Sequence, residues 1–503
     1  MKNICLLPIV IGLIVALTLF HFVSLALYPI PWVDETFFAS VSRDLLQRGK
    51  FFPFIAPINL QFNECFTYGP VYFLLQAFLF KCFSFSSYVA RLAGFIAGLF
   101  MCFALYKTFT LDKKESNLLA WLLIGGVLFD FSVFESFHSG RMETLALAFV
   151  FGYIYFILKN EKVLSSKTLY FNAMLYSFFA VLATLTTPRA SILLVAPGMI
   201  LLYRLIKERR IERFVELIIL SSIFMVVIVG WIYYAFGTLH SMIEYYRMVN
   251  QPFDFLKGFA FNTILVYQYP VILLSLLAVV ATIIICKRKF FSPINFISLV
   301  SIFLFYILVN MYRPYGIYVM VYFYLLFAQC IYMIQKANPD RVTLIVSSMA
   351  LYGLVGIMVL TTVVKAGYII DSYSERKSDS IDSFISKNIP KGSKVIGDEV
   401  YYFSVLKAGS DFQYIKWGDS DQNREKYQRV EYDYDYILMS DVLLKMSPQI
   451  FSVYQKNADL IIINRFNAPL SSITSYFNAH RPGLVFFYSY NGILYQRIKT
   501  GKI

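Results

Sequence analysis

The stretch PWVDETFFASVSRDLLQRGK, residues 31–50, decides how the rest of the chain is interpreted. It follows an apolar run, residues 4–30, that is long enough to cross a bilayer as a helix. It opens with two adjacent carboxylates, Asp34 and Glu35, and continues with the spacing of an amphipathic helix. Because charges at the edge of the hydrocarbon are costly, their position favours chemistry at the membrane surface. We therefore expect residues 29–70 to form an active-site loop.

The composition is that of a polytopic membrane protein. The 503 residues are 58% hydrophobic and 15% charged, whereas soluble domains are about half apolar and about a quarter charged. Residues 1–370 hold 28 Lys and Arg against 16 Asp and Glu, and residues 371–503 hold 17 against 15. The surplus lies mostly in alternate short loops, as the positive-inside rule predicts, so the net charge of +14 does not indicate nucleic-acid binding.

Eleven apolar segments are candidates for membrane-spanning helices. If the N-terminus is cytoplasmic, the basic loops all fall on the inner side, and the odd number of crossings places residues 31–50 and the C-terminal part together on the outer face. The run 71–83 is apolar but short, and we expect it to be re-entrant or interfacial. The predicted spans are Ile4–Tyr28, Tyr88–Thr110, Asn117–Phe137, Met142–Leu158, Leu169–Thr187, Ser191–Tyr203, Phe214–Phe236, Thr263–Cys286, Phe291–Asn310, Gly316–Ile334 and Val342–Lys365.

The chain divides into a transmembrane part, 1–370, and a small α/β domain, 371–503, which we expect on the outer face. An amphipathic helix is predicted over 378–390, and Asn491-Gly492 is a strong type I′ hairpin signal. The predicted strands are Lys394–Gly397, Tyr434–Met439, Leu460–Asn464, Leu484–Tyr490 and Ile493–Ile498.

Asp34 and Glu35 are the candidate catalytic residues. Asp34 would act as a general base that takes the proton from an acceptor hydroxyl, and Glu35 would orient it or help to bind a cation. The alternative is that the two acidic residues only mark the solvent-exposed end of a helix. The amphipathic helix that follows favours catalysis, because such a helix lies along the membrane surface and can place a site beside a lipid-borne substrate.

The six cysteines do not indicate a disulfide framework or a zinc site, because none lies in 371–503 and no metal-type spacing occurs. We expect that no cofactor is required. A divalent metal ion is compatible with the sequence but is not indicated by it.

The pattern W-x-D-E, followed by an amphipathic helix that ends in RGK-F-F-P, resembles the first outer loop of GT-C glycosyltransferases. Downstream, Pro70, Tyr72, a small-residue turn at 84–87 and Ala90-Arg91-Leu92 are similar in order and spacing to bacterial relatives of protein O-mannosyltransferases and aminoarabinose–lipid A transferases. The resemblance covers residues 28–100 and elsewhere rests on topology and a similar tail. Aminoarabinose transferases place Glu-Lys before the loop proline, where this chain has Tyr68-Gly69, and this departure argues against lipid A as the acceptor.

The resemblance implies a reaction on the outer, periplasmic face of the cytoplasmic membrane. A polyprenyl-phosphate-linked sugar, carried by undecaprenyl phosphate in a bacterium, would donate a glycosyl group with inversion to a hydroxyl of a lipid, glycan or protein. Asp34 would correspond to the family's catalytic acidic residue. A transporter or flippase of lipid-linked sugars and a polymerase or ligase of surface polysaccharide are the alternatives. A transporter would show paired broken helices or internal repeats, and neither is evident in the sequence.

A polyprenyl phosphate leaving group needs cations near the outer surface. Three arginines lie on outer turns, where the positive-inside rule disfavours them, so an anionic ligand would explain them; headgroup binding or helix capping is the alternative. Glu143 would bind sugar hydroxyls or pair with Arg141. The predicted substrate-binding residues are Arg141, Glu143, Arg189, Arg313, Tyr68 and Tyr315.

Overall fold

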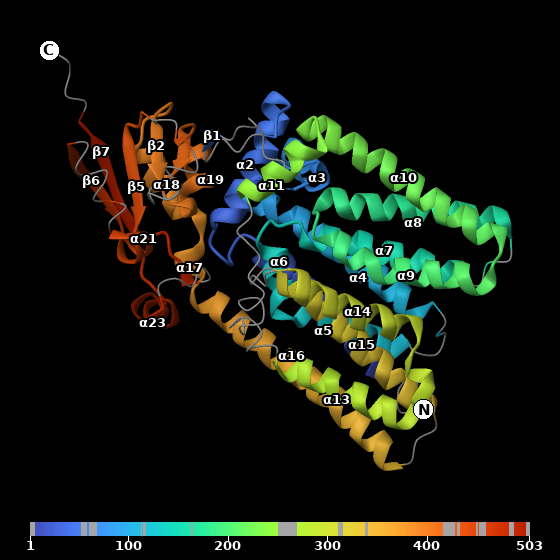
Figure 1. Ribbon diagram of the computed structural model, residues 1–503. Helices are drawn as coiled ribbons and strands as arrows, with labels where there is room; N and C mark the ends of the chain where they lie inside the picture. Colours follow the sequence, from blue (N-terminus) through green and yellow to red (C-terminus); the bar gives the residue numbers. More distant parts are fainter. Residues whose placement is uncertain are drawn as a thin grey trace.

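The computed structural model shows a bundle of long helices with a mixed β-sheet beyond one end (Figure 1). The predicted fold class, a polytopic helical membrane protein with a small α/β part near the C-terminus, is therefore confirmed. The described residues are 6–51, 58–59, 68–111, 113, 117–161, 163, 165–249, 269–309, 315–337, 341–415, 428–429, 433–448, 451, 459–481 and 487–498.

The bundle is built from helices that are apolar over most of their length. A short 3-10 helix, η2, links α13 to α14. The described helices of the bundle are α1 (Leu6–Ser24), α4 (Ser87–Thr110), α5 (Asn117–Phe129), α6 (Phe131–His138), α7 (Glu143–Asn160), α8 (Ser166–Thr186), α9 (Ala190–Glu208), α10 (Ile211–Phe236), α11 (Leu239–Val249), α13 (Tyr269–Cys286), η2 (Lys287–Phe290), α14 (Pro293–Leu308), α15 (Gly316–Lys336) and α16 (Arg341–Asp371).

Seven of the described helices are long and apolar enough to cross a membrane, and the bent pair α5–α6 gives an eighth if it counts as one span. The chain is thus a multi-pass membrane protein. The sequence predicted eleven spans. The numbers differ because α13 and α14 are among the shorter apolar helices, and because the side chains of part of α16 are not among those described.

The predicted span Asn117–Phe137 is not one continuous helix but the bent pair α5–α6. The chain bends by 62° between α5 and α6 at Asp130. The Asp130 side chain accepts a hydrogen bond from the Ser132 amide at 2.8 Å, so it caps the start of a new helix. At the other end of α6, His138 Nδ1 donates to the Tyr28 carbonyl at 2.7 Å. The break therefore fixes the end of α6 beside the segment that leads into residues 31–50.

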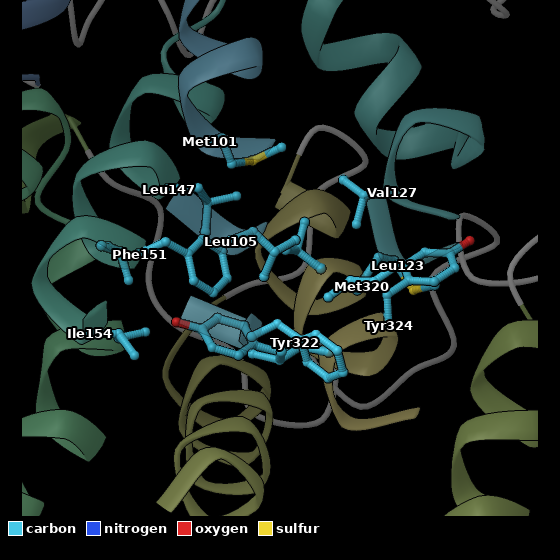
Figure 2. Packing of buried hydrophobic residues seen from close by; sticks show 14 of the residues in the cluster. Met101, Leu105, Leu123, Val127, Leu147, Phe151, Ile154, Met320, Tyr322 and Tyr324 are labelled. Carbon is cyan, nitrogen blue, oxygen red and sulfur yellow. The ribbon is translucent and has the colours of Figure 1, made fainter. Parts of the chain in front are cut away.

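Helix α15 lies at the centre of the bundle. Nearly every side chain from Gly316 to Ile331 is buried, as expected for a helix that is apolar on all sides. Tyr322 and Tyr324 pack among side chains of α4, α5 and α7 (Figure 2).

Two helices precede the second span, α2 (Val33–Arg48) and α3 (Pro70–Phe83), and they pack against each other. The predicted amphipathic helix is α2, which ends where Gly49 adopts a left-handed conformation (φ 70°) and its amide donates to the Leu45 carbonyl. The predicted short helix 71–83 is α3, which begins at a proline, a favoured residue in the first helical turn.

The C-terminal part contains a five-stranded mixed sheet in the order β3-β2-β5-β7-β6. Strand β2 is parallel to β3 and β5, and β7 is antiparallel to β5 and β6. The predicted helix 378–390 is α18 in this part. Its described elements are α17 (Tyr373–Arg376), α18 (Ser378–Asn388), β2 (Lys394–Gly397), η4 (Glu399–Tyr401), α19 (Tyr402–Lys407), β3 (Asp411–Tyr414), β5 (Tyr436–Ser440), α21 (Asp441–Met446), β6 (Leu460–Phe466), α23 (Ser472–His480) and β7 (Gly492–Arg497).

The predicted hairpin around Asn491-Gly492 is wrong for the residues that the structure describes. Residues 487–491 are not a strand, and β7 pairs instead with β5 and β6. Neither Asn491 nor Gly492 has the positive φ that a type I′ turn requires. The Asn491 side chain instead accepts from the Ala468 amide at 2.6 Å and donates to the Ala468 carbonyl at 3.0 Å, so it holds a neighbouring loop.

Strand β1 (Ile58–Asn59), between α2 and α3, and Phe85, between α3 and α4, contact the C-terminal part directly. Strand β1 pairs antiparallel with β4 (Gln428–Arg429), and Phe85 packs on Tyr402 and Phe403. Residues 31–50 and the C-terminal part therefore lie at the same end of the bundle, as the topology predicted.

Candidate active site

The first turn of α2 places Asp34 against a buried arginine. Arg141, in the turn between α6 and α7, forms an ion pair with Asp34 through Nη1. Its Nε and Nη2 donate to Glu143 Oε1 at 3.0 and 2.7 Å. The side chain of Arg141 is 0% exposed and that of Glu143 is 2% exposed, whereas that of Asp34 is 31% exposed. Asp34 is therefore the member of this triad that a substrate can reach.

Aromatic rings surround the Arg141 guanidinium. Its Cζ lies 5.5 Å from the ring centre of Trp32, 5.4 Å from that of Phe38 and 5.6 Å from that of Tyr315. A guanidinium at this distance from several ring faces is stabilised by cation–π attraction. Arg141 is thus fixed both by two carboxylates and by its aromatic surroundings.

A second arginine, Arg189, lies at the start of α9 and shares Tyr315 with Arg141. Its Cζ is 4.4 Å from the Tyr315 ring centre and 5.7 Å from that of Tyr68. Its Nη1 lies 3.5 Å from the Tyr68 hydroxyl, which is a long hydrogen bond. Most of the five guanidinium donors are therefore unused within the described residues, which leaves them for an anionic ligand.

The structure brings together six of the eight predicted site residues: Asp34, Tyr68, Arg141, Glu143, Arg189 and Tyr315. Arg313 lies outside the described residues.

Glu35 faces away from this cluster and into the bundle. Arg91 Nε and Nη2 donate to its two carboxylate oxygens at 2.7 and 2.8 Å, and both side chains are 0% exposed. Arg91 Nη1 also donates to the Leu25 carbonyl at 2.6 Å. This ion pair ties α2 to α4 and to the end of α1, so it favours a positioning role for Glu35 over the predicted part in catalysis.

Burial raises the pKa of Asp34 above its ordinary value, and the Arg141 guanidinium opposes that rise. The Glu143 carboxylate nearby acts in the same direction as burial. Arg141 donates to Oδ2, and within the described residues Oδ1 accepts no hydrogen bond. A carboxylate with a raised pKa and one unoccupied oxygen is suited to accept a proton from a substrate hydroxyl.

The departure from the aminoarabinose-transferase pattern at Tyr68-Gly69 has a structural reason. A Cβ on residue 69 would lie 1.9 Å from the carbonyl oxygen of Leu185 near the end of α8, so only glycine fits. The contact brings the start of α3 against α8 and places Tyr68 beside Arg189.

Within the ranges given above, the structure contains no group of three or more His, Cys, Asp or Glu residues arranged to hold a metal ion.

No protein-family model matches the chain, and no curated protein matches it. Among solved structures, ArnT from Cupriavidus metallidurans matches in the apo state with a TM-score of 0.60 and 13% identity over 96% of this chain and 97% of ArnT. ArnT bound to undecaprenyl phosphate matches with a TM-score of 0.62 and 12% identity over 97% of this chain and 98% of ArnT. The chain has a GT-C-like fold. The Archaeoglobus fulgidus oligosaccharyltransferase tethered with an acceptor peptide is also similar, with a TM-score of 0.51 and 9% identity over 89% of this chain and 71% of that one.

Within this GT-C-like fold, the sequence analysis did not identify three residues that form or support the site. Arg91 was noted as part of a motif but was given no partner, although a buried charge near the start of a span requires one. Trp32 and Tyr72 stand in the same motifs and are buried beside Arg141 and Glu143. The sequence could have identified Tyr72, because it places a hydroxyl group on a mostly apolar helix.

Proposed function

We propose that the chain is a glycosyltransferase that moves a sugar from a polyprenyl-phosphate carrier to an acceptor hydroxyl. The observation that carries the proposal is the cluster at one end of the bundle, in a GT-C-like fold. The accessible carboxylate of Asp34 pairs with Arg141, and Arg189, a guanidinium with unused donors, contacts the same Tyr315 ring as Arg141. The structure of ArnT with undecaprenyl phosphate supports a carrier of this class. We further propose that residues 371–503 form a separate domain. The end of the bundle that carries the Asp34 cluster would face the periplasm.

In the proposed reaction, Asp34 Oδ1 accepts the proton of the acceptor hydroxyl as that oxygen attacks the anomeric carbon. The bond between the anomeric carbon and the phosphate oxygen breaks, and the electron pair leaves with the phosphate. The phosphodiester thus becomes a phosphomonoester with one more negative charge. Arg189 stabilises that developing charge, because a preorganised cation in a partly desolvated site acts most strongly where charge appears.

Replacement of Arg189 by alanine should lower kcat/KM for a polyprenyl-phosphate sugar by about 10- to 100-fold, which corresponds to the loss of hydrogen bonds to a charged group. Lysine should recover part of the activity, since it keeps the charge but not the fork of donors. Steady-state kinetics on protein in nanodiscs measures both variants. The control is Arg210→Ala, which removes an exposed arginine paired with Glu212; equal losses in the control and in Arg189→Ala would contradict the phosphate role.

Activity should depend on the protonation of Asp34. Because its pKa is raised, the carboxylate becomes protonated, and activity falls, at a higher pH than for an ordinary aspartate with a pKa of about 4. The acidic limb of a plot of kcat/KM against pH measures this midpoint. A profile that stays flat down to the ordinary aspartate range would contradict the assignment of Asp34 as base.

A comparison of cells that contain the protein with cells that lack it tests the proposed function, and it does not require the sugar to be known. Mass spectrometry of envelope lipids, glycans and proteins, with and without the gene, should show one sugar-modified species that requires the protein. Restoration by the wild-type gene but not by the Asp34→Asn variant would support the proposal. Identical envelopes in all strains would contradict it.

A further inference from the structure

Three buried polar atoms near Arg141 have no hydrogen-bond partner among the described residues: Trp32 Nε1, the Tyr72 hydroxyl and Glu143 Oε2. They come from three elements, because Trp32 precedes α2, Tyr72 lies in α3 and Glu143 begins α7. Buried polar atoms in proteins nearly always have a partner. Three orphaned atoms in one place therefore indicate that a polar ligand completes the site.

The three side chains converge on the same guanidinium. Glu143 binds Arg141 through Oε1 only, the Trp32 ring lies 5.5 Å from the Arg141 Cζ, and Tyr72 interacts electrostatically with both Glu143 and Arg141. Burial and the Glu143 and Glu35 carboxylates raise the pKa of Tyr72 well above its usual value, so its hydroxyl keeps its proton. The orphaned set thus offers one acceptor, one donor and one hydroxyl that can do either.

We propose that Trp32, Tyr72 and Glu143 form the subsite for the sugar ring of the donor, with Glu143 Oε2 accepting from a sugar hydroxyl and Trp32 Nε1 donating to a sugar oxygen. This inference rests on the proposed function. A monosaccharide fits because its hydroxyl groups both donate and accept. Aromatic walls with a few placed polar groups, as here, are typical of sites for small ligands.

The charges of the site residues indicate where the phosphate and the sugar of the donor bind. A carboxylate oxygen repels a phosphate, so the phosphate does not occupy the Glu143 end. Arg189, which has unused donors, contacts the same Tyr315 ring as Arg141, and Tyr68, rather than Glu143, lies beside its guanidinium. The phosphate therefore binds at Arg189 and the sugar at Glu143, with Asp34 exposed beside them for the acceptor.

The test separates sugar binding from carrier binding. The full chain in nanodiscs is titrated with undecaprenyl phosphate alone and with undecaprenyl phosphates that carry glucose, mannose, galactose or N-acetylglucosamine. Wild type should bind at least one loaded carrier at least 10-fold more tightly than the bare carrier. Tyr72→Phe should lose most of that preference while its Kd for the bare carrier changes less than twofold. Tyr322→Phe, which removes a buried hydroxyl from the bundle core, is the matched control and should behave as wild type.

The fluorescence of Trp32 provides a second measurement. Its indole fluorescence should change when a preferred loaded carrier binds and not with the bare carrier, and Trp32→Phe should remove that change. If Tyr72→Phe keeps the wild-type preference, or weakens bare and loaded carriers equally, the three atoms serve a structural water and the subsite is refuted. If wild type binds no carrier at all, the proposed function fails and this inference fails with it.

Discussion

Replacement of Asp34 by asparagine is expected to lower the rate of sugar transfer by about 10²- to 10⁴-fold, the usual contribution of a general base. Asparagine keeps the shape of the side chain and can still contact Arg141, but it cannot accept the proton of the acceptor hydroxyl. Carrier binding at Arg189 should persist, so KM for the donor should change much less than kcat. Steady-state transfer with protein in nanodiscs measures both quantities.

The matched control for this variant is Asp379→Asn. Asp379 is an exposed aspartate in α18 that pairs with Lys377, so the control also removes one carboxylate. It should leave transfer unchanged. Wild-type turnover by Asp34→Asn, with correct folding shown by an unchanged melting temperature, would remove Asp34 from the chemical step.

Replacement of Arg91 by alanine is expected to have the largest effect on stability, about 3–5 kcal/mol, because it leaves the Glu35 carboxylate buried and unpaired. The loss should appear as a lower midpoint of thermal or denaturant unfolding in detergent. The double variant Arg91→Met with Glu35→Gln should recover part of the loss, because neither charge then remains buried.

An exposed arginine–carboxylate pair provides the control for Arg91. Arg465 donates to both oxygens of Asp441 at 2.9 and 3.0 Å at the surface of the sheet. Arg465→Ala should cost less than about 1 kcal/mol, as is usual for exposed pairs. Equal destabilisation by the two alanine variants would contradict the role of the Arg91–Glu35 pair as the anchor of α2.

The elements that the sequence predicted well are those set by local pattern. Apolar length marked the spans, and strand β2 was predicted with the observed bounds, Lys394–Gly397. The errors have tertiary causes. The break at Asp130 depends on a side chain that caps a new helix inside an apolar run. The type I′ turn predicted at Asn491-Gly492 is absent, and the Asn491 side chain instead binds the backbone of Ala468, 23 residues away in the sequence.

The candidate site also combines features that the local sequence predicts with features that depend on tertiary contacts. The sequence could nominate Asp34, Arg141 and Arg189, because charged residues at the outer ends of spans are costly and therefore informative. It could not show that Arg141 pairs with Asp34 from 107 residues away, nor that Glu35 turns toward Arg91. Adjacent residues on a helix point in different directions, and only the packing of α2 against α3 and α4 decides which carboxylate reaches the site.

The most direct test of the central claim follows the fate of a labelled donor. Purified protein in nanodiscs is given undecaprenyl phosphate linked to a radiolabelled sugar, together with an envelope extract as the source of acceptor. The account predicts that label moves to an acceptor while undecaprenyl phosphate is released in equal amount, and that Asp34→Asn stops both. Intact donor at the end of the reaction, combined with its movement across the bilayer in liposomes that contain the protein, would instead identify a transporter and contradict the account.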